Sequence, residues 1–565
     1  MLLVEALSHD SYDVIIVGSG GAGLRAALAA SEEGARVAIL TKSEPQRSGG
    51  TLSAHYSFCA ILPEAMPGDS PEVFAEDIVR SGEGISDREL VRILVEQAGD
   101  AVQYVADLGV SFDKQEEDAS RLHLGWLAGH SYARAAHVGN RVGSEMVRVL
   151  LKAIRKRQIP IHAFTHVTDL LVEDGQVRGA LAYHAPTGEV RVYTAPSVII
   201  ATGGGSQVYA LNTNPFEATG DGYGLALRAG IELLDMEFVQ HYPTVLVEPA
   251  GARGLMFNSG ILIPKGARLL NRHGEDFWDR YGVGDLKQAT RDVMSRVMAQ
   301  ELAAGGGTDA GGLYISTRGM DPDEFPQMQQ RLLEDLGIQT DAELREVAPG
   351  AHYFMGGIRI DSRTRTGVTG VFAAGECTGG IHGANRLAGN ALSENQVFGT
   401  IAGREAARHA LQNRTDEPSN DTVEKALSPV RGLLERAGTG GSGLTPLQGW
   451  SRVQQLMQQH VGVVREQQGL ELAVAELEGL RDELDQVRAR DASKVYNRDI
   501  VKALELRNMV DTGWSVAAAA ADRRESRGAH VRVDAPELRE EWQLSVTVRK
   551  DGERAATGKL QRQKG

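Results

Sequence analysis

Cysteine is almost absent from this chain. Among its 565 residues the only thiols are those of Cys59 and Cys377. Two cysteines cannot build a disulfide framework or hold an internal iron–sulfur cluster, because a cluster needs about four thiolate ligands. We therefore expect no metal centre in the chain, and any cluster that exchanges electrons with it would belong to another protein.

Basic residues and long apolar runs are also scarce. The 60 Lys and Arg residues are outnumbered by 75 Asp and Glu residues, which leaves a net charge of −15. This balance argues against a nucleic-acid partner, since phosphate binding needs clustered basic side chains. No stretch of about 18 apolar residues is present, and the N-terminal segment has no basic region ahead of an apolar one. We expect a cytoplasmic protein without direct membrane insertion, at most peripheral on the inner face of a membrane through partner subunits.

The chain does have enough hydrophobic residues for several hydrophobic cores. Hydrophobic residues make up 42% and charged residues 24%, which is the balance of a globular protein. Its length exceeds what one core usually supports, so two or three structural units are expected.

A glycine-rich turn near the N-terminus carries the first chemical signal. The apolar run Asp13–Val17 is followed by Gly18, Gly20 and Gly23 and then by helix-forming residues, and Arg36–Leu40 is a second strand-like run. This order predicts a βαβ unit. Glycines at this spacing let the backbone approach a pyrophosphate and aim a helix N-terminus at its charge. Dinucleotide binding is the favoured interpretation, and a purely structural glycine turn is the alternative.

The second strand-like run lacks the acidic residue of NAD-type sites. Leu40 is followed by Thr-Lys-Ser, which argues against an ordinary NAD-type ribose contact. Two later glycine segments, Ala201–Gly205 and Gly370–Glu376, follow strand-like runs, and Glu376 is a candidate acceptor for ribose hydroxyls. Three such segments spread over the chain indicate a nucleotide-binding domain interrupted by an insertion.

The pattern between and beyond these segments changes several times. Alternating runs from residue 166 to residue 200 predict a hairpin meander, and Ser86 with Glu89 has capping-box spacing ahead of a helical apolar stripe. Long helical patterns dominate from about residue 416. The expected division is 1–235 and 351–415 for the two parts of the nucleotide-binding domain, 236–350 for an inserted domain, 416–530 for a helical domain and 531–565 for an unassigned tail.

Several further segments carry a specific resemblance. In order, over residues 12–530, they are similar to successive signatures of the succinate dehydrogenase/fumarate reductase flavoprotein subunit family, whose relatives include L-aspartate oxidase and adenylylsulfate reductase. The segments are RSGGTLSAHYSFCAIL from Arg47, DMEFVQHYPT from Asp235, RDVMSR from Arg291, HYFMGG from His352, GVFAAGECTGGIHGANRLAGNAL from Gly370 and LELRNMVDTGWSVAAAAADRRESRGAH from Leu504.

This resemblance implies both a fold and an activity. The implied fold is α/β, with a Rossmann-like FAD-binding domain, an inserted α+β capping domain and a C-terminal helical domain. The implied activity is that of an FAD-dependent oxidoreductase that moves a hydride between flavin N5 and a small carboxylate substrate, with electrons passed to or from an iron–sulfur partner. The residues it assigns to FAD binding are Gly18, Gly20, Gly21, Ala22, Gly23, Thr41, Lys42, Ser48, Gly49, Gly50, Thr51, Thr202, Gly203, Gly204, Asp221, Gly375, Glu376, Ala391 and Leu392.

The same resemblance assigns the catalytic positions. Arg291 would be the general acid/base, and Arg386 and His352 would bind a substrate carboxylate. Tyr242 stands where the family has a catalytic-site histidine. An arginine is an unusual proton donor because its pKa is above roughly 12 in water, so its pocket must be closed, positively charged and dry. The plainer alternatives are an ion pair of Arg291 with a carboxylate such as Asp292 and an interdomain contact for His352.

The sequence departs from the family where the flavin is linked. Arg47-Ser48 is followed by Gly49 and Gly50, where the family has the histidine that bonds covalently to the flavin. We therefore expect noncovalent FAD, with His55 as a hydrogen-bonding neighbour. In this family a noncovalent flavin favours reduction of substrate over its oxidation.

A second departure affects one end of the substrate site. Gly260 and Ile263 fall where the family has the glutamate and arginine of a proton relay, and His241 points to the strand face opposite that of Tyr242. Leu127 replaces an acidic residue that L-aspartate oxidase has ahead of its Gly-His-Ser segment. A monocarboxylate or bulkier unsaturated acid is therefore expected to be preferred over succinate or fumarate. The candidates for restoring the missing charge are Arg253, Lys265 and Arg268.

Three functions remain open at this point. The first is a family flavoprotein that passes electrons to or from an iron–sulfur partner. The second is a stand-alone flavoprotein oxidase or reductase such as L-aspartate oxidase. The third is an electron-transfer flavoprotein subunit with little substrate turnover.

Overall fold

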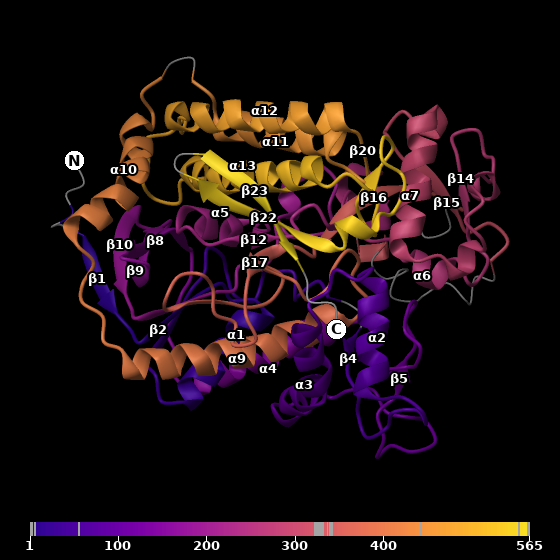
Figure 1. The fold of residues 1–565 in the computed structure, drawn as a ribbon, viewed down its shortest axis with the longest axis horizontal. Coiled ribbons are helices and arrows are strands. Elements are labelled where there is room, and N and C mark those ends of the chain that lie inside the picture. Colours follow the sequence, from indigo (N-terminus) through magenta and orange to yellow (C-terminus); the bar gives the residue numbers. More distant parts are fainter. Residues whose placement is uncertain are drawn as a thin grey trace.

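The glycine-rich turn follows the central strand of a five-stranded parallel sheet (Figure 1). This central strand pairs with a neighbouring strand on each side over its full length, and one further strand beyond each neighbour forms an edge of the sheet. The predicted βαβ unit is therefore confirmed. In order across the sheet the strands are β18 (Val371–Ala373), β11 (Ser197–Ile200), β2 (Val14–Val17), β3 (Val37–Leu40) and β7 (Ile161–His162).

This structure is a computed structural model. It describes residues 4, 7–54, 57–320, 333–335, 337, 343–440, 443–551 and 554–561. Within these ranges no helix combines the length and the apolar character that a membrane crossing requires.

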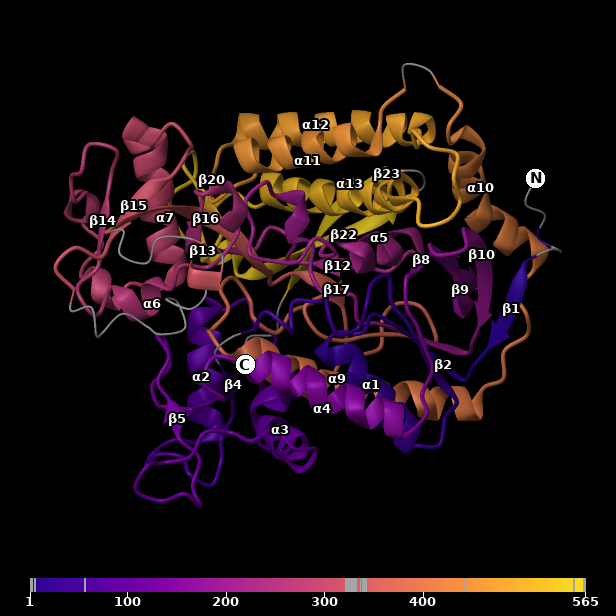
Figure 2. The same cartoon turned by 180° about the vertical axis from the view of Figure 1, so that it is seen from behind.

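Helices cover one face of the parallel sheet in close contact. Helix α1 (Gly21–Glu32) packs along α9 (Asn390–Gln412) and also contacts α4 (Val142–Lys156), as Figure 2 shows from behind. The close approach depends on small residues, because a Cβ atom at Gly399 or Gly403 would press against backbone oxygens of α1. Helix α9 thus lies against the glycine-rich turn, although the two are about 370 positions apart in the sequence.

The segment between β3 and α4 forms a small lobe of its own. It contains α2 (Pro71–Ser81), α3 (Arg88–Asp107) and a sheet of β4 (Phe58–Cys59), β6 (Ala135–Ala136) and β5 (Leu124–Gly125). The expectation that Ser86 caps α3 was wrong. Asp87 is the N-cap, and its carboxylate accepts from the amides of residues 89 and 90, which a side chain one position earlier does not reach.

The hairpin meander predicted for residues 166–200 is confirmed as a second sheet. It contains β8 (Thr165–Glu173), β9 (Gln176–His184) and β10 (Glu189–Thr194), and β1 (Ser8–Ser11) adds a parallel edge strand. Beyond it, α5 (Asp221–Arg228) leads to β12 (Leu233–Leu234) and so to the capping domain.

The capping domain has its own core and stands on one side of the molecule in Figure 1. Its buried residues include Phe257, Leu262, Trp278, Met298 and Leu313, which pack between the sheet and two helices. The domain boundaries at 236 and 350 stay a prediction, while the sheet runs on to residue 354. Its elements are β13 (Val239–Leu246), α6 (Ser259–Leu262), β14 (Arg268–Leu270), α7 (Arg291–Glu301), β15 (Leu313–Ser316) and β16 (Leu344–Phe354), with strand order β13-β16-β15-β14.

The C-terminal domain is helical, as expected, and it ends in a hairpin that the sequence did not predict. Helix α13 is buried among its neighbours, and the whole layer shares one core with the FAD-binding domain. The last strands extend a sheet of order β19-β17-β12-β22-β23. The elements are α10 (Asn420–Arg436), α11 (Pro446–His460), β20 (Val464–Arg465), α12 (Gln467–Glu483), α13 (Arg498–Asp522), β21 (Val531–Arg532), β22 (Leu544–Asp551) and β23 (Arg554–Gln561), joined by β17 (Gly357–Arg359) and β19 (Thr378–Gly379).

Candidate active site

A cavity of about 990 Å³ extends from the glycine-rich turn after β2 to the first turn of α7 in the capping domain. The four residues assigned to catalysis, Tyr242, Arg291, His352 and Arg386, all line it. So do all the residues assigned to the cofactor except Gly23, which lies behind the turn. The fold therefore gathers segments from the whole chain around one space.

The glycine-rich turn presents bare backbone to this cavity. Gly18 has φ +113°, and a Cβ there would overlap the carbonyl oxygen of Ala201. A Cβ at Gly23 would overlap the oxygen of Gly18, so that glycine serves the close packing of helix on strand. Helix α1 has no side-chain cap at Gly20, and the Gly21 amide donates to Thr51 Oγ1 at 3.0 Å. This uncapped helix start suits a diphosphate.

Glu376 lies beneath the second glycine segment. Its Oε1 atom accepts a hydrogen bond of 3.1 Å from the Phe354 amide, and a Cβ at Gly204 would overlap its carboxylate. Burial raises the pKa of Glu376 to about 7. A carboxylate held in this way, facing the cavity, is suited to accept hydrogen bonds from sugar hydroxyls.

Lys42 is held by two carboxylates, of which only Asp221 was predicted from the sequence. Its Nζ lies 2.8 Å from both Asp221 Oδ2 and Glu505 Oε1. Burial acts to lower the pKa of Lys42, but the two carboxylates outweigh it and raise that pKa. Glu505 was missed, although a glutamate on the buried face of α13 is a signal of a paired charge. Nearby His166 is buried, its ring nitrogens have no hydrogen-bond partner in the part of the chain that the structure describes, and burial lowers its pKa to about 4.

Arg386 is the most deeply buried cation at the other end of the cavity. Its Nη2 donates to Gln240 Oε1 at 2.9 Å, and its guanidinium lies 4.2 Å from the centroid of the Tyr353 ring. Among the described residues its Nε has no hydrogen-bond partner. Burial, with a further contribution from the positive charge of Arg291, lowers the pKa of Arg386 to about 10. A buried donor left open beside a second cation favours an anionic ligand.

Arg291 begins α7 and faces the same space. Its guanidinium carbon lies 5.1 Å from the ring centroid of Tyr242. The neighbouring Asp292 uses its Oδ1 to accept a hydrogen bond of 3.0 Å from Asn385 Nδ2. Among the described residues Arg291 forms no salt bridge, so the alternative of a purely structural ion pair with a carboxylate finds no support.

His352, Tyr242 and Asn258 form a further part of the cavity wall. His352 Nδ1 lies 2.7 Å from Thr213 Oγ1, and its ring packs at 5.5 Å from that of Tyr242. The Tyr242 hydroxyl donates to Asn258 Oδ1 at 3.3 Å. Burial raises the pKa of Tyr242, so this phenol stays neutral near pH 7. This side therefore offers hydroxyl, amide and imidazole groups.

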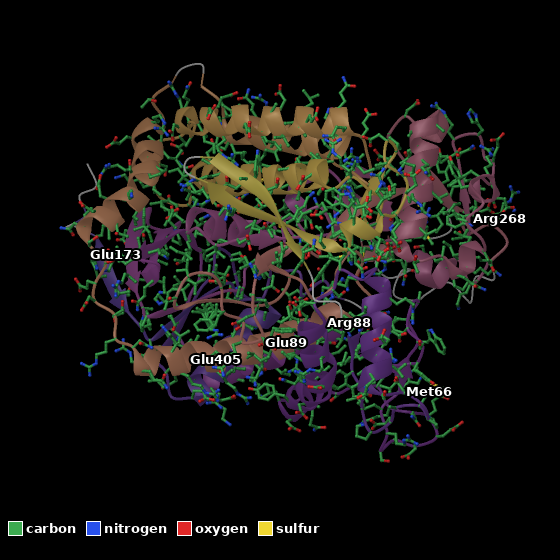
Figure 3. All side chains as sticks on the ribbon, viewed as in Figure 1. Met66, Arg88, Glu89, Glu173, Arg268 and Glu405 are labelled. Atoms are coloured by element: carbon green, nitrogen blue, oxygen red, sulfur yellow. The ribbon has the colours of Figure 1, made fainter. Side chains whose placement is uncertain are left out.

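The candidates for a compensating charge do not reach the cavity. Arg253, Lys265 and Arg268 are exposed and do not line it, and Arg268 lies on the outer edge of the capping domain (Figure 3). Ile263 is buried in the core of that domain, whereas Gly260 lines the cavity. Of the remaining sequence candidates, Leu127 lines the cavity, His241 packs at 5.4 Å against the ring of Tyr209, and His55 lies outside the described residues.

Comparison with known proteins decides the family. Residues 13–392 match the model of the FAD binding domain, and residues 450–563 match that of the fumarate reductase flavoprotein C-terminal region. The chain belongs to the fumarate reductase/succinate dehydrogenase flavoprotein family. It is therefore an FAD-dependent oxidoreductase, as the sequence segments predicted.

Members of this family resemble the chain over nearly its whole length. It is 38% identical to a subunit of fumarate reductase (CoM/CoB) from Methanothermobacter marburgensis, covering 95% of this chain and 96% of that protein. It is 32% identical to L-aspartate oxidase of Synechocystis sp., covering 96% and 98%. The structure of Sdh1 from Mycobacterium smegmatis superposes with a TM-score of 0.90 at 33% identity, covering 99% of this chain and 95% of that one. These matches confirm the expected three-part α/β fold.

Two residues of this flavoprotein site, Gln240 and Asn385, were not predicted from the sequence, although their positions next to predicted site residues indicate them. Gln240 stands two positions before Tyr242 on β13, so both side chains point to the same face of the strand. Asn385 directly precedes Arg386 and donates across to the capping domain. Thr213 and Asn258 had no local signal, because only the fold brings their loops to the cavity.

Proposed function

We propose that this flavoprotein exchanges a hydride between bound FAD and a small acid that carries one carboxylate. The observation that carries the proposal is that the guanidinium groups of Arg291 and buried Arg386 line the same cavity, and among the described residues neither forms an ion pair with a carboxylate. A carboxylate placed there gains charge-assisted hydrogen bonds and relieves the repulsion between the two guanidinium groups.

The residues of the chain divide the work between them. When bound in the glycine-lined part of the cavity, FAD supplies hydride exchange with a substrate carbon. Arg386, oriented by Gln240, holds the substrate carboxylate. His352, oriented by Thr213, hydrogen-bonds the same or the adjoining substrate group. Arg291 donates a proton to the substrate carbon in reduction and accepts it in oxidation. The aromatic rings of Tyr242 and Tyr353 limit access of water to the two guanidinium groups.

The neutral side of the site governs the choice of acid. Tyr242 and Asn258 offer hydrogen bonds without charge, and such bonds are roughly half as strong as charge-assisted ones. A second carboxylate is therefore favoured less than a neutral or aromatic group, and a monocarboxylate is the proposed substrate class. Fumarate is the second candidate, since the 38% identical relative is named for fumarate reductase.

A direct comparison of substrates tests this proposal. Turnover of unsaturated monocarboxylic acids and of fumarate is measured side by side with a reduced viologen as electron donor, and oxidation of saturated acids with a dye acceptor. We expect higher kcat/KM for the monocarboxylic acids and a loss of that preference in Arg386→Ala. The exposed Arg359, paired with Glu232, supplies the control Arg359→Ala. Higher kcat/KM for fumarate or succinate would overturn the substrate class, and no turnover of any acid would leave a flavin subunit that only transfers electrons.

Transfer of electrons between the flavin and another molecule requires an electron carrier outside this chain. Cys59 and Cys377 are both buried, so the chain offers no thiolates for a cluster of its own, and the proposed partner is an iron–sulfur subunit. Such a partner would also set the location, at the inner face of a membrane or in the cytoplasm. Purification from the native source under mild conditions tests this. A co-purifying iron–sulfur protein is expected, whereas an isolated chain that reacts rapidly with oxygen would favour a stand-alone oxidase.

A further inference from the structure

The proton that Arg291 gives to a substrate must be replaced after each reduction. The candidate proton donors are the carboxyl groups that line the same cavity as Arg291. Six carboxyl groups line the cavity in the described residues: Asp77, Glu83, Glu217, Asp221, Asp292 and Glu376.

Three of these six are engaged away from Arg291. Asp77 forms a buried ion pair of 2.6 Å with Arg134, and Asp221 forms one of 2.8 Å with Lys42. Glu376 is tied to the Phe354 amide beneath the second glycine segment. Glu217 lies in the loop that leads to α5, near the Lys42 cluster. Glu83 and Asp292 are the two that remain at the end of the cavity where α7 begins.

Asp292 is connected to both arginines of the site. It directly follows Arg291 in the first turn of α7, and its Oδ1 accepts from Asn385 Nδ2 at 3.0 Å. Asn385 Oδ1 in turn accepts from Gln240 Nε2 at 3.0 Å, and Gln240 also holds Arg386. This carboxylate therefore has a fixed position beside Arg291.

Glu83 is held in an unusual backbone conformation. It follows α2 between Gly82 and Gly84 and has φ +49°, a region that favours glycine. The Arg527 guanidinium donates to its carbonyl oxygen at 2.7 Å and pins the turn. A glutamate kept at such a strained position, with a side chain that lines the cavity, points to a role for that side chain.

We propose that Glu83, together with Asp292, resupplies the proton that Arg291 transfers. This inference rests on the proposed function and adds to it the route by which protons reach the site. Asp292 is the member beside Arg291, which it directly follows in α7, and Glu83 lies at the turn after α2.

The charges around Glu83 fit this role. Burial raises the pKa of Glu83, and the Asp292 charge raises it further. The Gly528 amide and the Arg527 guanidinium lower the same pKa, and Glu525 raises it. The balance is upward, so a larger fraction of Glu83 carries a proton near neutral pH than in an exposed glutamate.

The proton balance of the step is simple. During reduction an N–H bond of Arg291 breaks as a C–H bond forms on the substrate, and the electron pair of that N–H bond stays on nitrogen. An O–H bond of the carboxyl pair then breaks as the N–H bond of Arg291 forms again. The carboxylate that is left takes a proton from water at the cavity mouth, and oxidation runs the same transfers backwards. A neutral guanidine is a much stronger base than a carboxylate, so the return of the proton is downhill.

The other charged candidates do not offer this route. Gly260, the family's relay position that reaches the cavity, has no side chain, and Ile263 is buried in the capping-domain core. Arg253, Lys265 and Arg268 do not line the cavity. Glu83 approaches the same end of the site from the FAD-binding side instead of from the capping domain.

Variants of Glu83 in the FAD-loaded protein test the proposal. Glu83→Gln removes the exchangeable carboxyl proton, and we expect kcat for acid reduction to fall by about 10²-fold or more while KM stays within about twofold. Glu83→Gly suits the backbone at φ +49°, so it should keep the fold and the FAD content yet lose kcat to the same extent. Glu83→Asp keeps a carboxyl group and should retain part of the activity.

Controls separate this outcome from a structural effect and from failure of the proposed function. Glu76→Gln removes an exposed glutamate of α2, paired with Arg88, and should leave kcat unchanged. Reduction of the flavin by dithionite, which needs no substrate proton, should be the same in all variants. Turnover by the wild-type protein tests the proposed function itself, and the ratio of variant to wild type tests Glu83. A kcat of Glu83→Gln and Glu83→Gly within about threefold of wild type, or a pH profile of kcat that is identical in wild type and Glu83→Gln, would overturn the proposal.

Discussion

Gln240 orients Arg386 from the opposite domain. Its Oε1 accepts from the Arg386 guanidinium at 2.9 Å, while its Nε2 donates to the backbone oxygen of Arg386 at 2.9 Å and to Asn385 Oδ1 at 3.0 Å. The amide is thereby fixed in one orientation, with its oxygen toward the cation. Because β13 belongs to the capping domain and Arg386 to the FAD-binding domain, this contact ties substrate binding to the placement of the cap.

Removal of the Gln240 amide should weaken substrate binding. In Gln240→Leu the buried guanidinium loses a hydrogen bond, and bonds to charged groups contribute about 1.5–3 kcal/mol. We expect KM for the acid to rise by roughly tenfold or more, with kcat reduced less because Arg291 is untouched. Steady-state kinetics on the FAD-loaded variant checks this, with the exposed Gln103→Ala on α3 as control. An unchanged KM would mean that Arg386 keeps its position without Gln240.

Arg291→Ala should separate proton transfer from cofactor binding. The variant is expected to keep its FAD, because Arg291 lies at the capping-domain end of the cavity, and to lose turnover by about 10²–10⁴-fold. Reduction of the flavin by dithionite should proceed as in the wild type. If turnover falls only severalfold, Arg291 is a structural residue and the proton reaches the substrate by another path.

The flavin should be bound without a covalent bond. Gly49 and Gly50, which the sequence resemblance aligns with the family's linking histidine, line the cavity and have no nucleophilic side chain. Acid precipitation of the loaded protein should release yellow FAD into the supernatant. Yellow colour that stays in the pellet would contradict this and direct attention to His55.

FAD affinity should depend on pH through Glu376. Burial raises the pKa of Glu376 to about 7, so without cofactor the group is largely protonated below that pH. Sugar hydroxyls that donate to the carboxylate favour its ionised form, so binding releases a proton below pH 7 and weakens as the pH falls. The FAD dissociation constant should be about tenfold higher at pH 6 than at pH 8.

The variant Glu376→Gln tests whether this residue is the cause. Its FAD dissociation constant should be nearly independent of pH between 6 and 8. The buried His166 does not titrate in that range, since its pKa is lowered to about 4. An equal pH dependence in wild type and variant would assign the effect to another group.

The sequence by itself determined the parts of this protein that rest on local geometry. Gly18, Gly20 and Gly23 predicted the turn between strand and helix, because the left-handed backbone of Gly18 and the close packing at Gly18 and Gly23 leave no room for a side chain. The ordered segments through HGANRL and RDVMSR predicted the family, the cofactor and the pair Arg291 and Arg386. These signals lie within short stretches, so no knowledge of distant contacts was needed.

Tertiary structure decided what depends on contacts between distant segments. The hairpin β22–β23 was not predicted because its sheet partner, β12, lies more than 300 residues earlier in the chain. Glu505 joins Lys42 across 463 positions, and Gln240 meets Arg386 across 146. Glu83 and Asp292 line the same cavity although they are far apart in the sequence. Charges and hydrogen-bonding groups act through distances of a few ångströms, and only the packing of the capping domain on the FAD-binding domain sets those distances.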